Sequence, residues 1–431
     1  MRHISLNERY HMFSEAASSY EDKKLTFSLS DDIVATGFTA SAGSRILEGH
    51  RPVYDSTVSA RMRAAGGSLI GKTNMDEFGI GMFSVTGTDI PKNPFDLARS
   101  CGGPCGGAAC AASLLDGHVA LATSAGGGIS VPASFCGVLG LTPTHGRISR
   151  HGLIDSVSSM GPIGIMATNA DLLRRYLKVI SSGDPNDPVS AAQPDLVLGK
   201  SKLKAVAVPN GITDLVSTGV REAFDRSVGT LRDMSVDVEY VDIPELDYSM
   251  SAHYILATAE TALNLATYCG MRVGQQSGDM SLPFDDYFTS FRTKYFGTGV
   301  KKRIVAGTYM TLGDNRNELY MRSLGIRRLV MSRYEEILSE YDAILTPSTP
   351  ITAPTFDEVS GIRYTDEYLT GRFAVPPVFC GLPCLSVPCG YPDGVPAGLQ
   401  FTAARWNEDV LTDAAAAWEK AFDIKAPEAS L

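Results

Sequence analysis

The chain has 431 residues, of which 44% are hydrophobic, and its formal net charge is −10 at pH 7. This length can bury a large core, either as two or three domains or as one large α/β domain. The acidic balance argues against a broad cationic face for nucleic-acid phosphates. No apolar run approaches the length of a membrane span, and the N-terminal MRHISLNERYHMF does not have the pattern of a signal peptide. We therefore expect a cytoplasmic protein without a membrane anchor.

The first predicted elements are two strands and a helix. Residues 1–24 are polar, and we expect them to be helical or loosely packed. Residues 25–29 (LTFSL) alternate with period two, which predicts a strand. A helix is predicted over 55–65, with an Asp/Ser cap before it and two glycines after it, and a strand over 68–71. Lys72 follows that strand, and we expect it to have a structural role or to extend its ammonium to solvent.

Residues 101–140 are the most informative stretch of the chain. Two glycine-rich turns, 102–107 and 126–128, flank an Ala/Leu-rich helix and an apolar strand. Glycine at this density is needed where the backbone takes positive φ or approaches another group closely. Successive bare N–H groups in such a turn form a nest for an anion or a polarised carbonyl. Two ordinary tight turns in an α/β protein are the alternative explanation.

Helices and strands alternate further along the chain. Asn169 caps a predicted helix with an apolar stripe, which is typical of packing against a core. Residues 182–202 are rich in Pro, Ser and Asp and predict a surface connection, with a possible subdomain seam. Strands over 203–208 and 236–243 flank a helix over 218–234. This βαβ alternation predicts a sheet covered by helices.

The glycine turns and the sequences around them resemble the amidase signature, which reads roughly GGSSGGSAAA, a helix, and GSDTGGSIRxPAAFCG. Further matching runs are GKTNMDEF, KNPFDLAR and GLTPTHGRISRHGLI. TNMDEF and GLPCLSVPCG…PAGLQF (381–401) are similar to the A subunits of glutamyl-tRNA amidotransferases. The resemblance covers nearly all of 25–420. It implies a shortened N-terminal segment (1–24) and a single domain over 25–425, an α/β fold of α/β/α layers around a mixed, twisted β-sheet.

Members of this family hydrolyse amides with a Ser–cis-Ser–Lys triad, and all three catalytic side chains are replaced here. By resemblance the nucleophile position is Gly128, the bridging-serine position is Pro104 and the lysine position is Ser30. Ser124 and Ser130 stand where the family carries an Asp and an Arg. A nucleophile needs a displaceable lone pair and a base within hydrogen-bond reach. We therefore expect the chain to lack amidase and glutaminase activity of its own.

Part of the binding machinery is expected to remain. The backbone N–H groups that can still face an amide carbonyl or an oxyanion belong to Ala125, Gly126, Gly127 and Gly128. By resemblance, Arg303 in the stretch 297–307 holds a substrate carboxylate, a task that suits a bidentate guanidinium. A solvated basic turn is the alternative for that stretch. Gly371 stands where the family uses an Asp to read the amine of glutamine, so the glutamine site has changed together with the triad.

Two cysteine runs share the spacing Cys-x₃-Cys-x₄-Cys. They are Cys101, Cys105 and Cys110, and Cys380, Cys384 and Cys389. Thiolates can hold zinc or an iron–sulfur cluster, but this spacing is not a standard ligand signature, so we expect buried thiols and neither a metal nor a cofactor. Cys105 replaces the second serine of GGSSGG and is a candidate displaced nucleophile. His145 or His151 would be its base, although surface or core histidines are the usual case.

Three hypotheses follow for the function. The first is a non-catalytic relative of the amidotransferase A subunit that has a binding or scaffold role, with protein partners and with tRNA held mainly by a partner. The second is a working amidotransferase component with displaced catalytic groups or an external source of ammonia. The third is different chemistry in the same pocket, through Cys105 or a metal. We favour the first, because the three triad positions changed together.

Overall fold

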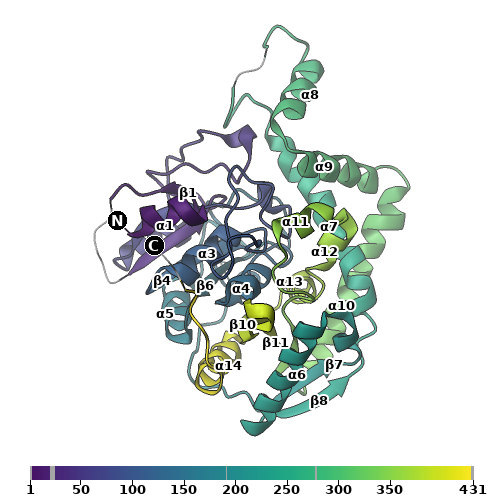
Figure 1. Ribbon diagram of the computed structural model, residues 1–431. Coiled ribbons are helices and arrows are strands. Elements are labelled where there is room, and N and C mark those ends of the chain that lie inside the picture. The colour runs from purple at the N-terminus through teal and green to yellow at the C-terminus, as the bar shows by residue number, and fades with distance from the viewer. Residues whose placement is uncertain (1, 20–24, 191, 277–278, 429–431) are drawn as a thin grey trace.

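The computed structural model describes residues 2–19, 25–190, 192–276 and 279–428, and a single mixed β-sheet runs through it (Figure 1). The strand order is β1-β3-β2-β4-β6-β5-β10-β11-β9-β7-β8. The strands are β1 (Phe13–Ala16), β2 (Thr26–Ser30), β3 (Ser68–Thr73), β4 (His118–Thr123), β5 (Leu139–Thr142), β6 (Ile163–Ala167), β7 (Ala205–Pro209), β8 (Asp237–Val241), β9 (Ala343–Pro347), β10 (Cys384–Gly390) and β11 (Ala397–Ala403). The pairs of β2 with β3 and β4, and of β7 with β8 and β9, are parallel, and the other pairs are antiparallel.

Helices cover both faces of this sheet. They are α1 (Arg2–Tyr10), α2 (Thr57–Ala64), α3 (Gly106–Leu114), α4 (Ser130–Cys136), α5 (Ala170–Ile180), α6 (Thr218–Asp233), α7 (Leu246–Asn264), α8 (Phe284–Tyr295), α9 (Thr298–Thr311), α10 (Arg322–Ile337), α11 (Phe356–Gly361), α12 (Tyr364–Leu369), α13 (Val375–Cys380) and α14 (Glu408–Ala421). Alternate residues of a strand point to opposite faces. Val119 and Leu121 of β4 accordingly pack in the cluster that contains α2, α5, α6 and α14, whereas Ala120 and Ala122 pack with α3 and α4. The predicted α/β/α layers are therefore confirmed.

The elements predicted from local patterns lie within one to three residues of their expected bounds. Strand β2, helix α2 with its Ser56 cap, helix α5 with its Asn169 cap, and the parallel β7–α6–β8 unit are all present. The N-terminal segment forms the expected helix, α1, and also strand β1, which pairs antiparallel with β3 and was not expected. The described parts of 182–202 contain no helix or strand.

A buried ion pair joins the loop after β5 to the start of α14. Arg147 and Glu408 are 1% and 0% exposed, and Arg147 Nη2 lies 3.1 Å from Glu408 Oε2. The guanidinium also stacks on the Trp406 ring at 4.7 Å and donates to the Pro194 carbonyl at 2.6 Å. Because both side chains are buried, removal of either one would leave the other charge unpaired in a low-dielectric environment. The pair therefore fixes the C-terminal helix against the sheet.

Removing the Glu408 charge with Glu408→Gln should lower the free energy of unfolding by about 3–5 kcal/mol, since Arg147 would remain buried and unpaired. The matched control is Asp214→Asn, which breaks the exposed pair of Asp214 and Arg221 and should cost less than about 1 kcal/mol. Urea unfolding monitored by circular dichroism measures both. Equal losses in the two variants would contradict this account of the buried pair.

Helices α7, α9 and α10 form a helical region at one side of the sheet, and α8 projects beyond it (Figure 1). Both α9 and α10 pack against α7. Within the described ranges, no helix has the length and hydropathy needed to cross a bilayer.

Candidate active site

The two glycine-rich turns meet at the carboxyl ends of β2 and β4. These strands are parallel neighbours, so the residues that follow them lie at the same edge of the sheet. The first turn leads into α3, and its Gly103–Pro104 peptide bond is cis, the arrangement that the family resemblance gives to the bridging serine. The second turn follows Thr123 and leads into α4, with Gly127 at φ +111°. The fold thus brings both turns together.

Two of the three triad positions, Gly128 and Pro104, lie in contact, and neither carries a hydroxyl. A Cβ built on Gly128 would lie 3.2 Å from Pro104 Cγ and would overlap the Thr123 carbonyl oxygen. The proline ring therefore lies directly beside the nucleophile position. Ser30 is buried at the end of β2 and donates a hydrogen bond to Asp32 Oδ1. Pro104 therefore lies beside Gly128, and Ser30 is bonded to Asp32, which lines the same cavity as Pro104.

The cavity at this place is very small. It is lined by Asp32, Pro104, Thr123, Ala125 and residues of the loops beside them, and its volume is about 20 Å³. A water molecule needs roughly 10–15 Å³ measured in this way. The cavity therefore has room for about one water and not for an amino-acid side chain.

The second glycine turn contains the N–H groups that the sequence predicts to form an anion nest. Within the described residues, the backbone N–H groups of Ala125, Gly126, Gly127 and Gly128 donate no hydrogen bond to another backbone group. Two neighbouring serines, Ser124 and Ser130, are buried at the positions of the family's Asp and Arg. A buried Asp without the Arg, or a buried Arg without the Asp, would destabilise the fold. Replacement of both residues by serine leaves no unpaired buried charge.

A carboxyl–hydroxyl pair that sequence analysis missed occupies the floor of the cavity. Thr123 Oγ1 donates to Asp32 Oδ2 at 2.6 Å. Burial raises the pKa of Asp32, against the opposite effect of the Ser30 and Thr123 hydrogen bonds. Adjacent Asp31 and Asp32 in the sequence were the available signal, but nothing local indicated that Asp32 would turn inward. An acidic group therefore lies beside the position where relatives place a catalytic lysine.

Lys72 is fully buried, which corrects the expectation that it could extend to solvent. Its ammonium donates a hydrogen bond to the Ile33 carbonyl. Burial lowers the pKa of Lys72 to about 8, and the charges of Asp31 and Asp32 act in the opposite direction. Lys72 lies within β3 and not after it, so its side chain is enclosed by the sheet and the elements packed on it. Its role is to balance buried carboxyls.

His253 of α7 packs against the second glycine turn, and sequence analysis gave no signal for this contact. A Cβ on Gly126 would lie 2.7 Å from His253 Cε1. His253 Nε2 is 2.6 Å from the Ala125 carbonyl oxygen, which only accepts, so Nε2 carries the proton. Nδ1 then accepts from the Tyr368 hydroxyl. Burial lowers the pKa of His253 to about 4, so this ring is neutral and holds the turn in place.

Arg303 lies on helix α9 and is 8% exposed, so the alternative of a solvated basic turn is wrong. Its guanidinium lies 4.9 Å from the Tyr254 ring centre and 5.6 Å from that of Tyr368. Nε donates to the Tyr364 hydroxyl at 3.1 Å. It lines a cavity of about 120 Å³ together with Met82, separate from the 20 Å³ cavity.

Gly371 packs beside the second glycine turn. A Cβ there would lie 3.0 Å from Met82 Cε and 3.3 Å from the Gly126 carbonyl oxygen. Met82 also lines the Arg303 cavity, so its side chain lies between that cavity and Gly371. The position of the family's glutamine-reading Asp is therefore closely packed, and an Asp side chain would displace these neighbours.

Cys105 does not have the environment of a reactive thiol. It is fully buried, its Sγ lies 3.5 Å from the Thr123 carbonyl oxygen, and burial strongly raises its pKa. A thiol with a raised pKa carries almost no thiolate near neutral pH. The two histidines considered as its base contact other residues: His145 lies beside Gly381, and His151 lies beside the Tyr54 ring.

The first cysteine run packs in one cluster with Cys136, whereas Cys380 and Cys389 of the second run lie in different clusters. Cys101 interacts with Cys110 of its own run and with Cys136, which belongs to neither run. Across the part of the chain that the structure describes, no three His, Cys, Asp or Glu side chains are grouped as a metal site.

This combination of a mixed sheet, two glycine turns and a cis peptide beside the nucleophile position defines an amide-hydrolase fold. The model of the Amidase family matches residues 24–411, and the chain belongs to the amidase signature family. It is 34% identical over 406 residues to the A subunit of glutamyl-tRNA(Gln) amidotransferase from Geobacillus stearothermophilus, covering 93% of this chain and 83% of the relative.

Solved structures agree with this assignment. The crystal structure of the glutamyl-tRNA(Gln) amidotransferase A subunit from Thermotoga maritima matches with a TM-score of 0.83 at 30% identity, over 99% of this chain and 92% of that one. A 6-aminohexanoate cyclic dimer hydrolase matches with a TM-score of 0.82 at 22% identity, over 99% of this chain and 93% of that one, which shows the shared fold alone. The chain is therefore similar to amidotransferase A subunits in both sequence and structure.

Proposed function

We propose that this chain is a non-catalytic relative of the amidotransferase A subunit, with a binding or scaffold role. The main observation behind the proposal is that the Pro104 ring lies beside Gly128, where the side chain of a nucleophile would have to lie. The cavity that Pro104 lines has a volume of only about 20 Å³. Gly128 offers no nucleophile, Pro104 has no hydroxyl, and Ser30 cannot act as a base near neutral pH. Loss of the nucleophile of a serine hydrolase costs on the order of a millionfold in kcat.

The proposed binding role rests on groups that relatives use for recognition. The N–H groups of residues 125–128 and the guanidinium of Arg303 are candidates for an amide or a carboxylate. The cavity beside Arg303, about 120 Å³, has room for a small carboxylate, whereas the cavity at Gly128 does not. Binding without hydrolysis is the expected outcome.

Protein partners and a cytoplasmic location are part of the same proposal. The curated relatives are subunits of an amidotransferase, so we propose that this chain also assembles with other subunits. The net charge of −10 disfavours direct binding of tRNA by this chain alone, and a partner would hold any tRNA.

The purified chain should release no ammonia from glutamine or asparagine above the rate of a denatured sample. The reason is the missing triad, which should lower turnover by about a millionfold relative to a catalytic member of the family. A coupled ammonia assay with the Thermotoga maritima relative as the positive control measures this. Turnover at the rate of that control would overturn the proposal.

Assays of the native complex separate this proposal from a working enzyme component supplied with ammonia from elsewhere. A scaffold role predicts that neither glutamine nor ammonium salts support amidation of a charged tRNA. Amidation that uses ammonium salts but ignores glutamine would instead establish the hypothesis of a working component.

A further inference from the structure

The outward side of helix α9 is apolar, whereas an exposed helix side is ordinarily polar. Val305 and Leu312 are 71% and 60% exposed, and Tyr309 between them is 61% exposed. Val305 and Tyr309, four residues apart, lie on one stripe of α9, and Leu312 follows as the C-cap of the helix. The buried residues of α9, such as Val300 and Gly307, lie on the opposite side. These three side chains are therefore not part of the core.

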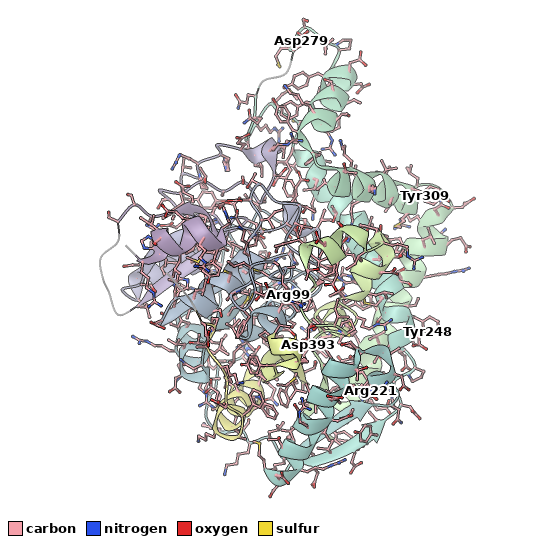
Figure 2. The ribbon with its side chains drawn as sticks, in the orientation of Figure 1. Arg99, Arg221, Tyr248, Asp279, Tyr309 and Asp393 are labelled. Atoms are coloured by element: carbon pink, nitrogen blue, oxygen red, sulfur yellow. The ribbon has the colours of Figure 1, made fainter. Side chains whose placement is uncertain are left out.

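The next helical segment repeats this arrangement. A π-helical turn (Arg316–Met321) runs directly into α10, and none of its residues is buried. Met321, Leu324 and Leu329 are exposed at 43%, 36% and 62%. We call the six residues of the two segments the outer apolar face: Val305, Tyr309, Leu312, Met321, Leu324 and Leu329. Figure 2 shows Tyr309 at the outer edge of the molecule.

The outer apolar face lies in a basic part of an acidic chain. Residues 298–333 contain eight Lys and Arg but only two Asp and Glu, although the whole chain has a net charge of −10. Of these cations, Arg303 is buried, and Arg322 and Arg333 are paired with Glu318 and Glu336 at 2.8 and 2.6 Å. Arg316 and Arg328 are exposed, and the described residues provide no ion pair for either. The overall acidic composition gave no indication of these two arginines.

We propose that the outer apolar face binds an acidic segment of a partner protein that packs apolar side chains against the exposed residues of α9 and α10. The inference rests on the proposed scaffold function and specifies the chemistry of the partner. Apolar groups supply the affinity, and complementary charges supply orientation and rate. A second copy of this chain would present Arg316 and Arg328 to the same residues, which is repulsive in a two-fold dimer. Exposed Val and Leu side chains cannot form hydrogen bonds or ion pairs with phosphate groups, which disfavours a nucleic acid or a phospholipid as the ligand.

Two synthetic 18-residue peptides test the proposal, both with Leu at helical spacing i, i+3, i+4 and i+7, one with Glu and the other with Lys at the remaining positions. We expect the Glu peptide to bind the full-length chain at least about tenfold more tightly than the Lys peptide in fluorescence anisotropy. Leu312→Asp, and separately Arg316→Glu with Arg328→Glu, should each weaken the Glu peptide by about tenfold. Circular dichroism of each variant verifies that it is folded.

The matched controls are Leu215→Asp and Arg221→Glu, which make the same changes at exposed positions outside the outer apolar face. Arg221 lies on α6 and is labelled in Figure 2. They should leave the affinity within about twofold of wild type. Equal binding of the two peptides, or unchanged binding by the face variants, would refute the inference. So would tighter binding of tRNA or of phosphatidylglycerol vesicles at this face, or a dimer that the face variants dissociate. The ammonia assay is independent of these results and tests the scaffold function separately.

Discussion

Lowering the pH from 7 to 4 is expected to remove much of the stability of this chain, because two buried histidines and one partly buried histidine must stay neutral in the folded state. Burial lowers the pKa of His118 to about 3, and those of His253 and His145 to about 4. His118 lies between the hydroxyls of Thr26 and Ser28 at 3.1 and 2.9 Å, so no carboxylate can stabilise its charged form there. An unfolded histidine titrates near about 6.5.

The sign of the effect follows from proton binding. Below about pH 6.5 the unfolded chain binds more protons than the folded chain, so stability is complete above that pH and falls as the pH decreases. Each of the three histidines should cost about 3 kcal/mol by pH 4. Burial raises the pKa of Asp76 to about 6, which acts in the opposite direction and offsets about 3 kcal/mol. The net loss from these four groups is about 6 kcal/mol, which is comparable with the total stability of many proteins, and the raised pKa values of Asp32 and Glu77 reduce this loss.

Urea unfolding at pH 7.5, 6.5, 5.5 and 4.5 measures this loss. His118→Gln keeps a side chain that can bond to Thr26 and Ser28 but cannot titrate, so it should reduce the net loss of stability at low pH by about one half. His11→Gln, at a partly exposed residue that contacts Asp89, is the matched control. Equal free energies of unfolding at pH 7 and pH 5 would show that the buried histidines do not control acid stability.

Local sequence patterns predicted much of the fold, because the information for these elements lies within a few residues. Period-two alternation was sufficient for β2, and the Asn169 cap with its apolar stripe was sufficient for α5. The positions of Pro104 and Gly128 were predicted from the motifs around them, and the two residues are in fact adjacent in space. Strand β1 was missed because its pairing partner, β3, lies more than fifty residues away.

The site details that sequence analysis missed all depend on long-range packing. His253 is 128 residues from Ala125, and its hydrogen bond is possible only because α7 crosses the glycine turn. The burial of Lys72 depends on neighbouring strands and on two carboxyls of another strand end. The volume of the cavity depends on packing between residues that are far apart in the sequence. The substitutions at the catalytic positions therefore could not predict it. The small cavity is therefore information that only the structure provides.

Gly128→Ser should restore no amide hydrolysis and should destabilise the fold. The new Cβ would overlap the Thr123 carbonyl oxygen and lie 3.2 Å from Pro104 Cγ, so backbone or ring must move. Overpacking of this kind costs about 1–3 kcal/mol. Even a correctly placed serine would have no base, because Ser30 replaces the lysine, and turnover should remain about a millionfold below that of catalytic relatives.

The matched control for this substitution is Gly229→Ser in α6, where a Cβ would meet no atom within 4 Å. Its stability should change by less than about 0.5 kcal/mol. Urea unfolding compares the two variants, and the ammonia assay and mass spectrometry after incubation with an amide substrate test for turnover and for an acyl adduct. Turnover at an ordinary enzymatic rate in Gly128→Ser would mean that Asp32 or another titratable group had replaced the missing base. In that case, the nucleophile would be the only catalytic function that this chain lacks.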